Sequence, residues 1–423
     1  MYKNIAADQT FVRENNLSTI LRYIFFNSSP VFRAQLAERI GLNKSTVSSL
    51  VQELMERNLI HETGMNSIGN LGRPATFLEV DPQAGFIIGV DLGLEFISIM
   101  IADFKGKTVW QRKIPINSIK SQEETITRTN ELIQDAITIC KEKNNRILGL
   151  GVAVPGMVDT NEGVLIYAPH LDWHDVPFKK IFSESTGLDV VYIENDANAS
   201  AIGEHLYGVA RETMDFIFVF AGIGIGSGLF LKGKLYSGMN GYAGEVGHMP
   251  IIAEPFQNQC DCGNLGCWET YANQNLFIQR MQEKLKTKKN AIISSIMAAQ
   301  NEPLSISVLK RAADENDSDS IEIFREAGRA IGIGIAGLIN IFNPDKVIVG
   351  GPMSISGDHL LPAINESVKN HSLPVLNKDV EILISAFGPD ATVIGSVALV
   401  ANHILSKPTI VERRWPGGEK EQE

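Results

Sequence analysis

The sequence predicts an α/β protein in which a small, mainly helical N-terminal domain precedes a larger domain built from two similar α/β lobes. Helical patterns separated by a short turn occupy much of the first 80 residues. Further on, a strand, a glycine-rich turn and a second strand occur twice, near residues 85 and 215. We therefore expect domains at residues 1–82 and 83–405, and a tail at 406–423 that lacks periodicity and is loose.

The charge of the chain is unevenly distributed. The 423 residues carry a net charge of −11, which alone argues against a nucleic-acid binder. The first 80 residues, however, hold eight Lys and Arg against seven Asp and Glu, a net charge of 8 − 7 = +1. This difference from the rest of the chain indicates a separate N-terminal module with a different partner. No apolar run of about 18 residues and no leader pattern occurs, so we expect a cytoplasmic protein without a membrane segment.

The N-terminal domain contains the pattern of a helix-turn-helix. Apolar spacing predicts helices over 11–27 and 33–40, and after a turn at Gly41 a further helix begins at its N-cap, Asn43. The first turns of that helix present short polar side chains and one cation, which suit a DNA major groove. The expected DNA-binding residues are Asn43, Lys44, Ser45, Thr46, Ser48 and Ser49. The alternative is an αα-hairpin with a solvated face.

Two short strands after these helices predict a wing. They lie at residues 59–60 and 77–80, and a Gly- and Asn-rich loop with a single charge, Arg73, joins them. An Arg on such a loop can enter a narrow minor groove, where the negative potential is enhanced. Arg73 is therefore a further candidate for DNA contact, although a plain turn with a surface Arg explains the same residues.

The larger domain repeats one structural plan. An apolar strand at 85–93 and the strands after it are matched by the strand, glycine-rich turn and strand at 215–236. Two copies of one plan indicate an internal duplication.

Four residues of metal-binding type lie close together in the second half of the chain. They are His248, Cys260, Cys262 and Cys267. Zn²⁺ binds thiolate sulfur and imidazole nitrogen tetrahedrally, and a closed set of four ligands is typical of a structural site. Such an ion would hold the flanking carboxylates Glu245 and Glu269 in one place. The alternative is a set of ordinary buried cysteines or a disulfide.

Two segments around this cluster resemble the signature of the ROK family of sugar kinases and sugar-responsive repressors. They read GEVGH (244–248) and CDCGNLGCWE (260–269). The resemblance implies a two-lobed fold of the hexokinase–actin type, which is a duplicated ribonuclease-H-like fold. It places lobe one at about 83–197 plus a C-terminal helix at 391–405, and lobe two at about 198–390.

The N-terminal module extends the resemblance. Repressors of this family carry a winged helix-turn-helix ahead of the sugar domain, and its kinases lack one. The segments ADQTFVRENN (7–16) and GLNKSTVSSLV (41–51) are most similar to the xylose-repressor branch. The implied partners are operator DNA, a monosaccharide (xylose or glucose-like) and a second copy of the chain, in a homodimer or a higher oligomer.

The resemblance also implies a set of sugar-binding residues. They are Asn195, Asp196, Glu245, His248 and Glu269, whose carboxylates and amides suit vicinal hydroxyls. In a kinase Asp196 would take the proton of the sugar hydroxyl. Asn195 and Asp196 also fit a helix cap, and the two glutamates fit support of the metal ligands. Trp173 could stack beneath a sugar ring, but an aromatic residue there is more often core.

Both expected phosphate-binding turns depart from the family's kinases. The first reads DLGLE, with Leu94 where a glycine allows phosphate to approach and Glu95 where a Thr would stand. The second reads AGIGIG, with Ile223 in place of a Thr. We therefore expect a sugar-responsive repressor, not an enzyme. An ATP-dependent sugar kinase and a repressor displaced by a protein partner remain the alternatives.

Overall fold

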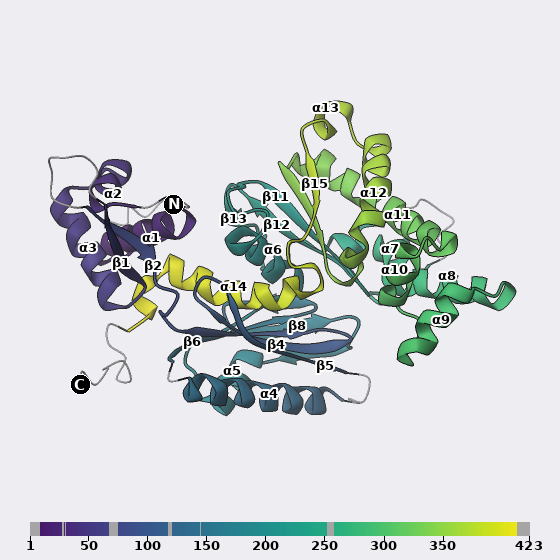
Figure 1. Ribbon diagram of the computed structural model, residues 1–423, viewed down its shortest axis with the longest axis horizontal. Helices are drawn as coiled ribbons and strands as arrows, with labels where there is room; N and C mark the ends of the chain where they lie inside the picture. Colours follow the sequence, from purple (N-terminus) through teal and green to yellow (C-terminus); the bar gives the residue numbers. More distant parts are fainter. Residues whose placement is uncertain are drawn as a thin grey trace.

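A computed structural model describes residues 9–27, 29, 31–66, 75–116, 121–143, 145–251 and 258–412. Figure 1 shows the N-terminal helices at one end of the molecule and two α/β lobes beside them. Among the described helices, none is long and apolar enough to cross a membrane.

The N-terminal domain consists of α1 (Gln9–Phe26), α2 (Arg33–Ile40), α3 (Lys44–Glu56) and the antiparallel strands β1 (Ile60–Asn66) and β2 (Ala75–Val80). Gly41 ends α2 in the left-handed region at φ 73°, which glycine adopts without strain. The side chain of Asn43 begins α3 by accepting a hydrogen bond from the N–H of Thr46 at 2.8 Å. The predicted helix-turn-helix is confirmed, and the predicted wing position of Arg73 lies outside the described residues.

The larger domain contains two five-stranded sheets of the same design. In lobe one β3 (Phe86–Leu92), β4 (Phe96–Asp103), β5 (Thr108–Pro115), β6 (Ile147–Val154) and β10 (Val191–Asn195) lie in the order β10-β6-β3-β4-β5. In lobe two β11 (Phe216–Ala221), β12 (Ile225–Leu231), β13 (Lys234–Leu235), β14 (Lys346–Gly350) and β15 (Glu381–Ile384) lie in the order β13-β12-β11-β14-β15.

The pairing within the two sheets confirms the predicted duplication. In each lobe the first three strands of the sequence pair antiparallel, and the fourth and fifth strands join parallel to the first. A smaller sheet of β7 (Met157–Asp159), β8 (Val164–Ala168) and β9 (Trp173–Val176) extends lobe one.

Helices cover both sheets. In lobe one, α4 (Gln122–Glu142) packs on β3 and β4, and α5 (Phe178–Thr186) packs on β10. The helical part of lobe two consists of α7 (Glu269–Ala272), α8 (Gln274–Thr287), α9 (Ala291–Gln300), α10 (Ile306–Asp314), α11 (Ser318–Phe342), α12 (Gly357–His371) and α13 (Pro374–Asn377). Glycines at 328 and 332 in α11 let α12 approach closely, because a Cβ at either position would meet its backbone.

The two lobes exchange a helix. α6 (Asp196–Tyr207) follows the last strand of lobe one but packs on β11 and β12 of lobe two. α14 (Ala391–Ser406) follows the last strand of lobe two but packs on β3 and β6 of lobe one, as Figure 1 shows in yellow. The two helices cross at Gly203 and Gly395, where a Cβ on Gly395 would lie 2.3 Å from the carbonyl carbon of Ala199.

The end of the chain differs from the predicted loose tail. Beyond α14 a short 3-10 helix (Pro408–Ile410) forms, and Pro408 and Val411 are buried. The guanidinium of Arg57, at the end of α3, donates a hydrogen bond to the carbonyl of Val411. The prediction was wrong for residues 407–412, because their order comes from contacts with a distant part of the chain. Residues 413–423 lie outside the described ranges.

The glycine crossing gives a first testable prediction. Gly395→Ala is expected to lower the free energy of unfolding by about 2 kcal/mol, because the added methyl group meets backbone that cannot move aside. Gly337→Ala in α11 is the matched control, since the atom nearest to its Cβ is the methyl carbon of Met249 at 3.7 Å. Removing a helical glycine there is expected to stabilise by up to about 1 kcal/mol. Urea denaturation measures both, and equal effects would contradict the packing argument.

Candidate functional site

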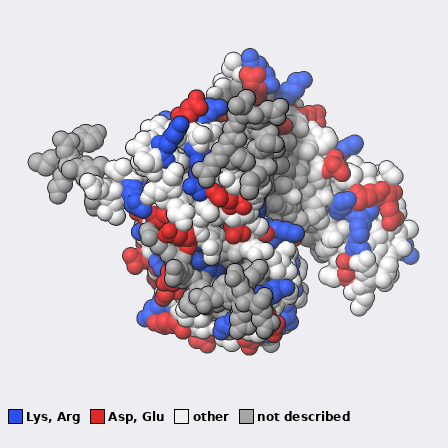
Figure 2. Space-filling view, turned by 60° about the vertical axis from the view of Figure 1, so that its left-hand side comes forward, with Lys and Arg blue, Asp and Glu red and all other residues white. Residues whose placement is uncertain are grey.

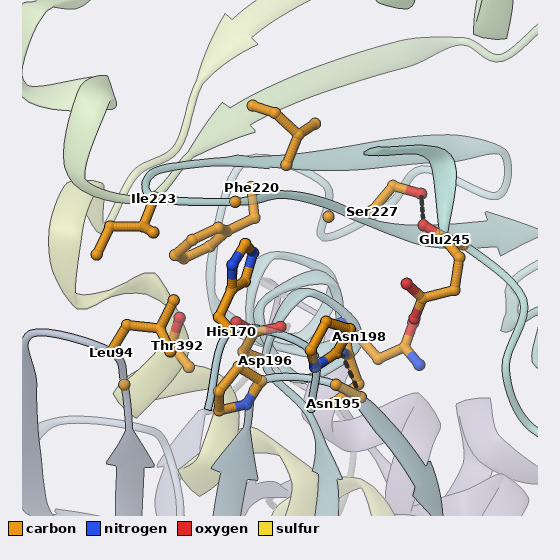
Figure 3. A pocket seen from close by; sticks show the side chains of 18 of the residues that line it. Leu94, His170, Asn195, Asp196, Asn198, Phe220, Ile223, Ser227, Glu245 and Thr392 are labelled. Carbon is orange, nitrogen blue, oxygen red and sulfur yellow. Dashed lines mark hydrogen bonds between the residues drawn. The ribbon is translucent and has the colours of Figure 1, made fainter. Parts of the chain in front are cut away.

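A pocket of about 130 Å³ lies between the two lobes. Its lining includes Asp91, Leu94, His170, Asn195 and Asp196 from lobe one and α6, and Ile223, Glu245, His248 and Glu269 from lobe two. In Figure 3, His170 and Asp196 lie between a group with Glu245, Asn195 and Asn198 and a group with Leu94, Ile223 and Phe220. The pocket therefore has a polar half and an apolar half.

The start of α6 forms the floor of the polar half. The Asn195 side-chain oxygen accepts from the N–H groups of Ala197 and Asn198 at 2.9 and 3.1 Å, and its amide donates to the carbonyl of Gly156 at 3.0 Å. Asn195 therefore acts as a helix cap as well as lining the pocket. Asp196, the first residue of the helix, accepts from the N–H of Ala197 at 2.8 Å.

Several carboxyl groups beneath the pocket have raised pKa values. Burial raises the pKa of Asp196 to about 6, with a further rise from the charge of Glu245. Burial and then the charge of Asp196 raise the pKa of Asp91 to about 7. Burial also raises the pKa of Glu194 to about 7, although it accepts hydrogen bonds from Asn195 and Asn198. Such values occur where carboxyl groups are kept for a functional purpose.

The predicted ligand cluster is brought together. The ligand atoms of His248, Cys260, Cys262 and Cys267 all lie within 4.8 Å of one another, and none of these cysteines forms a disulfide. Sγ of Cys262 and Sγ of Cys267 are 3.8 Å apart, and Sγ of Cys260 is 3.5 Å from Nδ1 of His248. A tetrahedral ion bound at its usual distances separates two sulfurs by about 3.8 Å and sulfur from nitrogen by about 3.5 Å. The cluster therefore fits a metal ion.

The two glutamates lie on either side of His248. Oε1 of Glu269 is 3.6 Å from Nδ1 of His248 and 2.8 Å from Sγ of Cys260, and the Glu269 side chain is buried. Oε2 of Glu245 is 3.6 Å from Nε2 of His248. His248 thus directs one nitrogen to the cysteines and the other toward the pocket.

The electrostatics of the two glutamates differ. Although burial acts to raise it, hydrogen bonds from His170 and Cys260 hold the pKa of Glu269 below its ordinary value. Burial, followed by the charge of Glu269, raises the pKa of Glu245. Glu269 is therefore a fixed anion in the polar half, which suits a hydrogen-bond acceptor for hydroxyl groups.

His170 is the pocket residue that sequence analysis missed. It follows β8, with Nε2 3.6 Å from Oε2 of Glu269 and Nδ1 3.0 Å from Oδ2 of Asp261. The Glu269 hydrogen bond, opposed by burial and helped by Asp261, raises the pKa of His170 to about 9. Sequence alone did not distinguish it from the neighbouring His174, which is exposed. Trp173 is buried beside Phe178, so the core interpretation of that residue is correct.

The two glycine-rich turns line the apolar half. In the first turn, the N–H of Gly93 donates to the carbonyl of Phe96 at 3.0 Å. In the second, the N–H of Gly222 donates to the carbonyl of Gly224 at 3.1 Å. These two donors are occupied within their own turns, and Leu94 and Ile223 add apolar surface to the pocket.

The predicted DNA-binding residues lie at the start of α3. Lys44, Ser45 and Ser49 are exposed, and Thr46 and Ser48 are half-buried. Asn43 accepts from the hydroxyl of Ser45 and the N–H of Thr46, so it also serves as the cap. Figure 2 shows basic and acidic side chains interspersed over the face that is turned forward. Lys44 is the one cation among the predicted residues of this segment, so a DNA contact by the start of α3 would depend mainly on polar groups.

The comparisons with known proteins agree with this fold. Residues 87–403 match the ROK family, and residues 20–64 match the IclR helix-turn-helix domain. The chain belongs to the ROK family. It is 33% identical to the xylose repressor of Bacillus spizizenii over 400 residues, which cover 94% of this chain and 98% of that repressor.

Solved structures show the same arrangement. A ROK family transcriptional regulator, a homolog of the E. coli Mlc protein, matches 95% of this chain and 99% of its own with a TM-score of 0.79 and 25% identity. A ROK family glucokinase from Streptomyces griseus, in complex with glucose and AMPPNP, matches 74% of this chain and 99% of its own with a TM-score of 0.66 and 28% identity. The kinase match leaves out part of this chain, whereas the regulator spans nearly all of it.

The raised pKa of Asp91 gives a prediction about pH. The folded protein holds a proton on Asp91 up to about pH 7, whereas the unfolded chain loses it near pH 3.8, so this group makes stability fall as the pH rises between those values. Asp91→Asn removes that fall. We expect the variant to match the wild type near pH 4 and to exceed it by up to about 4 kcal/mol above pH 7, measured by urea denaturation across this range. A difference that does not change with pH would contradict this.

Proposed function

We propose that the protein is a transcriptional repressor that binds operator DNA through its winged helix-turn-helix and releases it when a monosaccharide enters the pocket between the lobes. D-xylose is the first candidate, because a relative that is 33% identical to this chain over 400 residues is a xylose repressor. The observation that carries the proposal is that one helix, α14, extends from the polar pocket between the lobes to α1, which in turn packs on α3.

Helix α14 offers a physical connection between pocket and DNA-binding domain. Thr392, in its first turn, lines the pocket and lies 3.2 Å from the hydroxyl of Ser200 in α6. At its other end, the carbonyl of Leu405 accepts from Ser18 of α1 at 2.7 Å. Arg22 of α1 donates to Asn402 and Ser406 at 2.9 and 2.7 Å. A sugar that favours one arrangement of the lobes would therefore also favour one position of α1.

The proposal does not include phosphate transfer. Leu94 and Ile223 replace a glycine and a threonine of the kinase turns, and Glu95, Asp91 and Asp196 would oppose a polyphosphate. A sugar kinase remains the second candidate, because Asp196 is a buried carboxyl group placed as a base and the glucokinase has the same fold.

The central experiment measures binding of labelled DNA from upstream of the protein's own gene by anisotropy, with and without a panel of monosaccharides. We expect tight binding that one sugar abolishes. Lys44→Ala should weaken binding and lower the dependence of log K on log salt concentration by about 1, since one phosphate contact is lost. Lys141→Ala, at the end of α4 far from α3 in sequence, is the matched control and should leave both quantities unchanged.

The other outcomes separate the alternatives. Tight DNA binding that no sugar changes would favour displacement by a protein partner. Absence of specific DNA binding at low salt, together with sugar-dependent ATP turnover that Asp196→Asn removes, would favour the kinase.

We further propose that the cluster of His248, Cys260, Cys262 and Cys267 holds Zn²⁺ in a cytoplasmic protein. A bound ion would fix His248 and Glu269 against the pocket. Cys262→Ser is expected to lose most of the zinc measured by atomic absorption. It should also weaken the effect of sugar on DNA binding, because zinc binding and the position of the pocket residues depend on the same cluster. Cys140→Ser, in the core of lobe one, should retain the metal. Full sugar response in a metal-free Cys262→Ser protein would show that the ion does not shape the pocket.

We also propose a homodimer, because a palindromic operator presents two half-sites to two readers. An apolar patch of Ile341, Leu373 and Val375 is exposed by 64, 58 and 65% at the end of α11 and around α13. Ile341→Glu is expected to shift the sedimentation coefficient toward the monomer, whereas Met239→Glu, at an exposed apolar residue outside this patch, should not. Identical sedimentation of both variants would exclude this patch as the interface.

A further inference from the structure

The half of the pocket that faces away from Asn195 and Glu245 is built from apolar side chains. Leu94 and Phe96 come from the first turn of lobe one, Phe220, Ile223 and Pro352 come from lobe two, and Pro389 precedes α14. Figure 3 shows Leu94, Phe220 and Ile223 on one side of His170 and Asp196, opposite Glu245. We call Leu94, Phe96, Phe220, Ile223, Pro352 and Pro389 the apolar wall.

None of these six side chains is fully buried, and Phe96 is 39% exposed. The wall thus presents apolar surface to water inside a pocket, which is unfavourable until something covers it. The second glycine-rich turn also fixes the positions of two of these side chains. A Cβ on Gly222 would lie 2.9 Å from the ring of Phe220 and 3.1 Å from Pro352, so the second turn packs directly on both.

A phosphate group does not suit the wall. Lys113 is the one Lys or Arg among the lining residues, and its ammonium lies over the Phe96 ring at 4.6 Å. Five carboxyl groups line the same pocket and outnumber the two cationic side chains, Lys113 and His170; they belong to Asp91, Glu95, Asp196, Glu245 and Glu269. A polyanion would meet more like charge than opposite charge there, and apolar side chains would desolvate it.

The polar and apolar halves meet at His170 and Asp196. A monosaccharide held by the groups around Glu245 and Glu269 would present one edge toward these two residues, and a substituent on that edge would extend onto the apolar wall. We propose that the pocket accepts a monosaccharide that carries one small apolar substituent, an O-alkyl or O-acyl group, and binds it more tightly than the free sugar. The inference rests on the proposed sugar-binding function of the polar half.

The physical basis is the removal of apolar surface from water on both partners. Each methylene group buried against the wall strengthens binding without a new hydrogen bond. The sugar hydroxyls keep their partners in the polar half, so the substituent adds to the affinity of the parent sugar. A three-carbon chain on the correct hydroxyl is therefore expected to tighten binding at least tenfold.

The test uses the full-length protein and isothermal titration calorimetry. The probes are D-xylose and D-glucose and the complete set of mono-O-propyl regioisomers of each sugar. We expect one regioisomer to bind at least tenfold more tightly than its parent. Ile223→Thr should reduce that gain to less than about threefold, because a hydroxyl group then lies in the wall. Ile333→Thr, the same change at a partly exposed position in α11, is the matched control and should keep the gain.

The outcomes distinguish this inference from the proposed function. If a parent sugar binds and no regioisomer binds more tightly, the apolar wall is not a ligand subsite, while the sugar-binding proposal stands. A gain that persists unchanged in Ile223→Thr would also overturn the inference, since the substituent then lies elsewhere. If neither the parents nor any regioisomer binds, both proposals fail for these sugars.

Discussion

The structure depends on the close contact between α6 and α14 at Gly203 and Gly395. No side chain separates the two helices at that point, so their backbones approach to a distance that only glycine permits. Both helices begin at the pocket. α6 follows the sheet of lobe one and covers the sheet of lobe two, whereas α14 follows the sheet of lobe two and covers the sheet of lobe one. A change in the angle between the lobes would therefore also change the contact between α6 and α14. Because α14 also contacts α1, the same crossing joins the pocket to the DNA-binding domain.

The polar half of the pocket is organised by residues that are distant in sequence. The cluster at 248–267 carries Glu269 on its C-terminal side, and Glu269 in turn contacts His170 of lobe one. One buried carboxylate thus connects the histidine and cysteine cluster of lobe two to a histidine from the opposite lobe. The strength of that connection depends on the distance between the lobes, which makes it sensitive to how far the cleft is closed.

Local sequence signals predicted much of this arrangement, and long-range contacts account for what was missed. The range of α2 follows from the periodicity of its apolar residues, and the start of α3 follows from its cap at Asn43. The Cys and His spacing predicted the cluster because its cysteines are neighbours in the chain. His170 gave no such signal, since its partners Asp261 and Glu269 are about 90 residues away or more. The order of residues 407–412 was missed for the same reason, because it depends on Arg57.

The exchange of helices between the lobes has a consequence for how the chain is assembled during synthesis. One face of the lobe-one sheet is covered by α14, which follows the last strand of lobe two in the sequence. The apolar side chains of β3 and β6 on that face remain without their partner until α14 has left the ribosome. The sheet of lobe one, which is synthesised first, is therefore covered only after the strands of lobe two have been made, and a nascent chain cannot form the finished pocket before α14 has been synthesised.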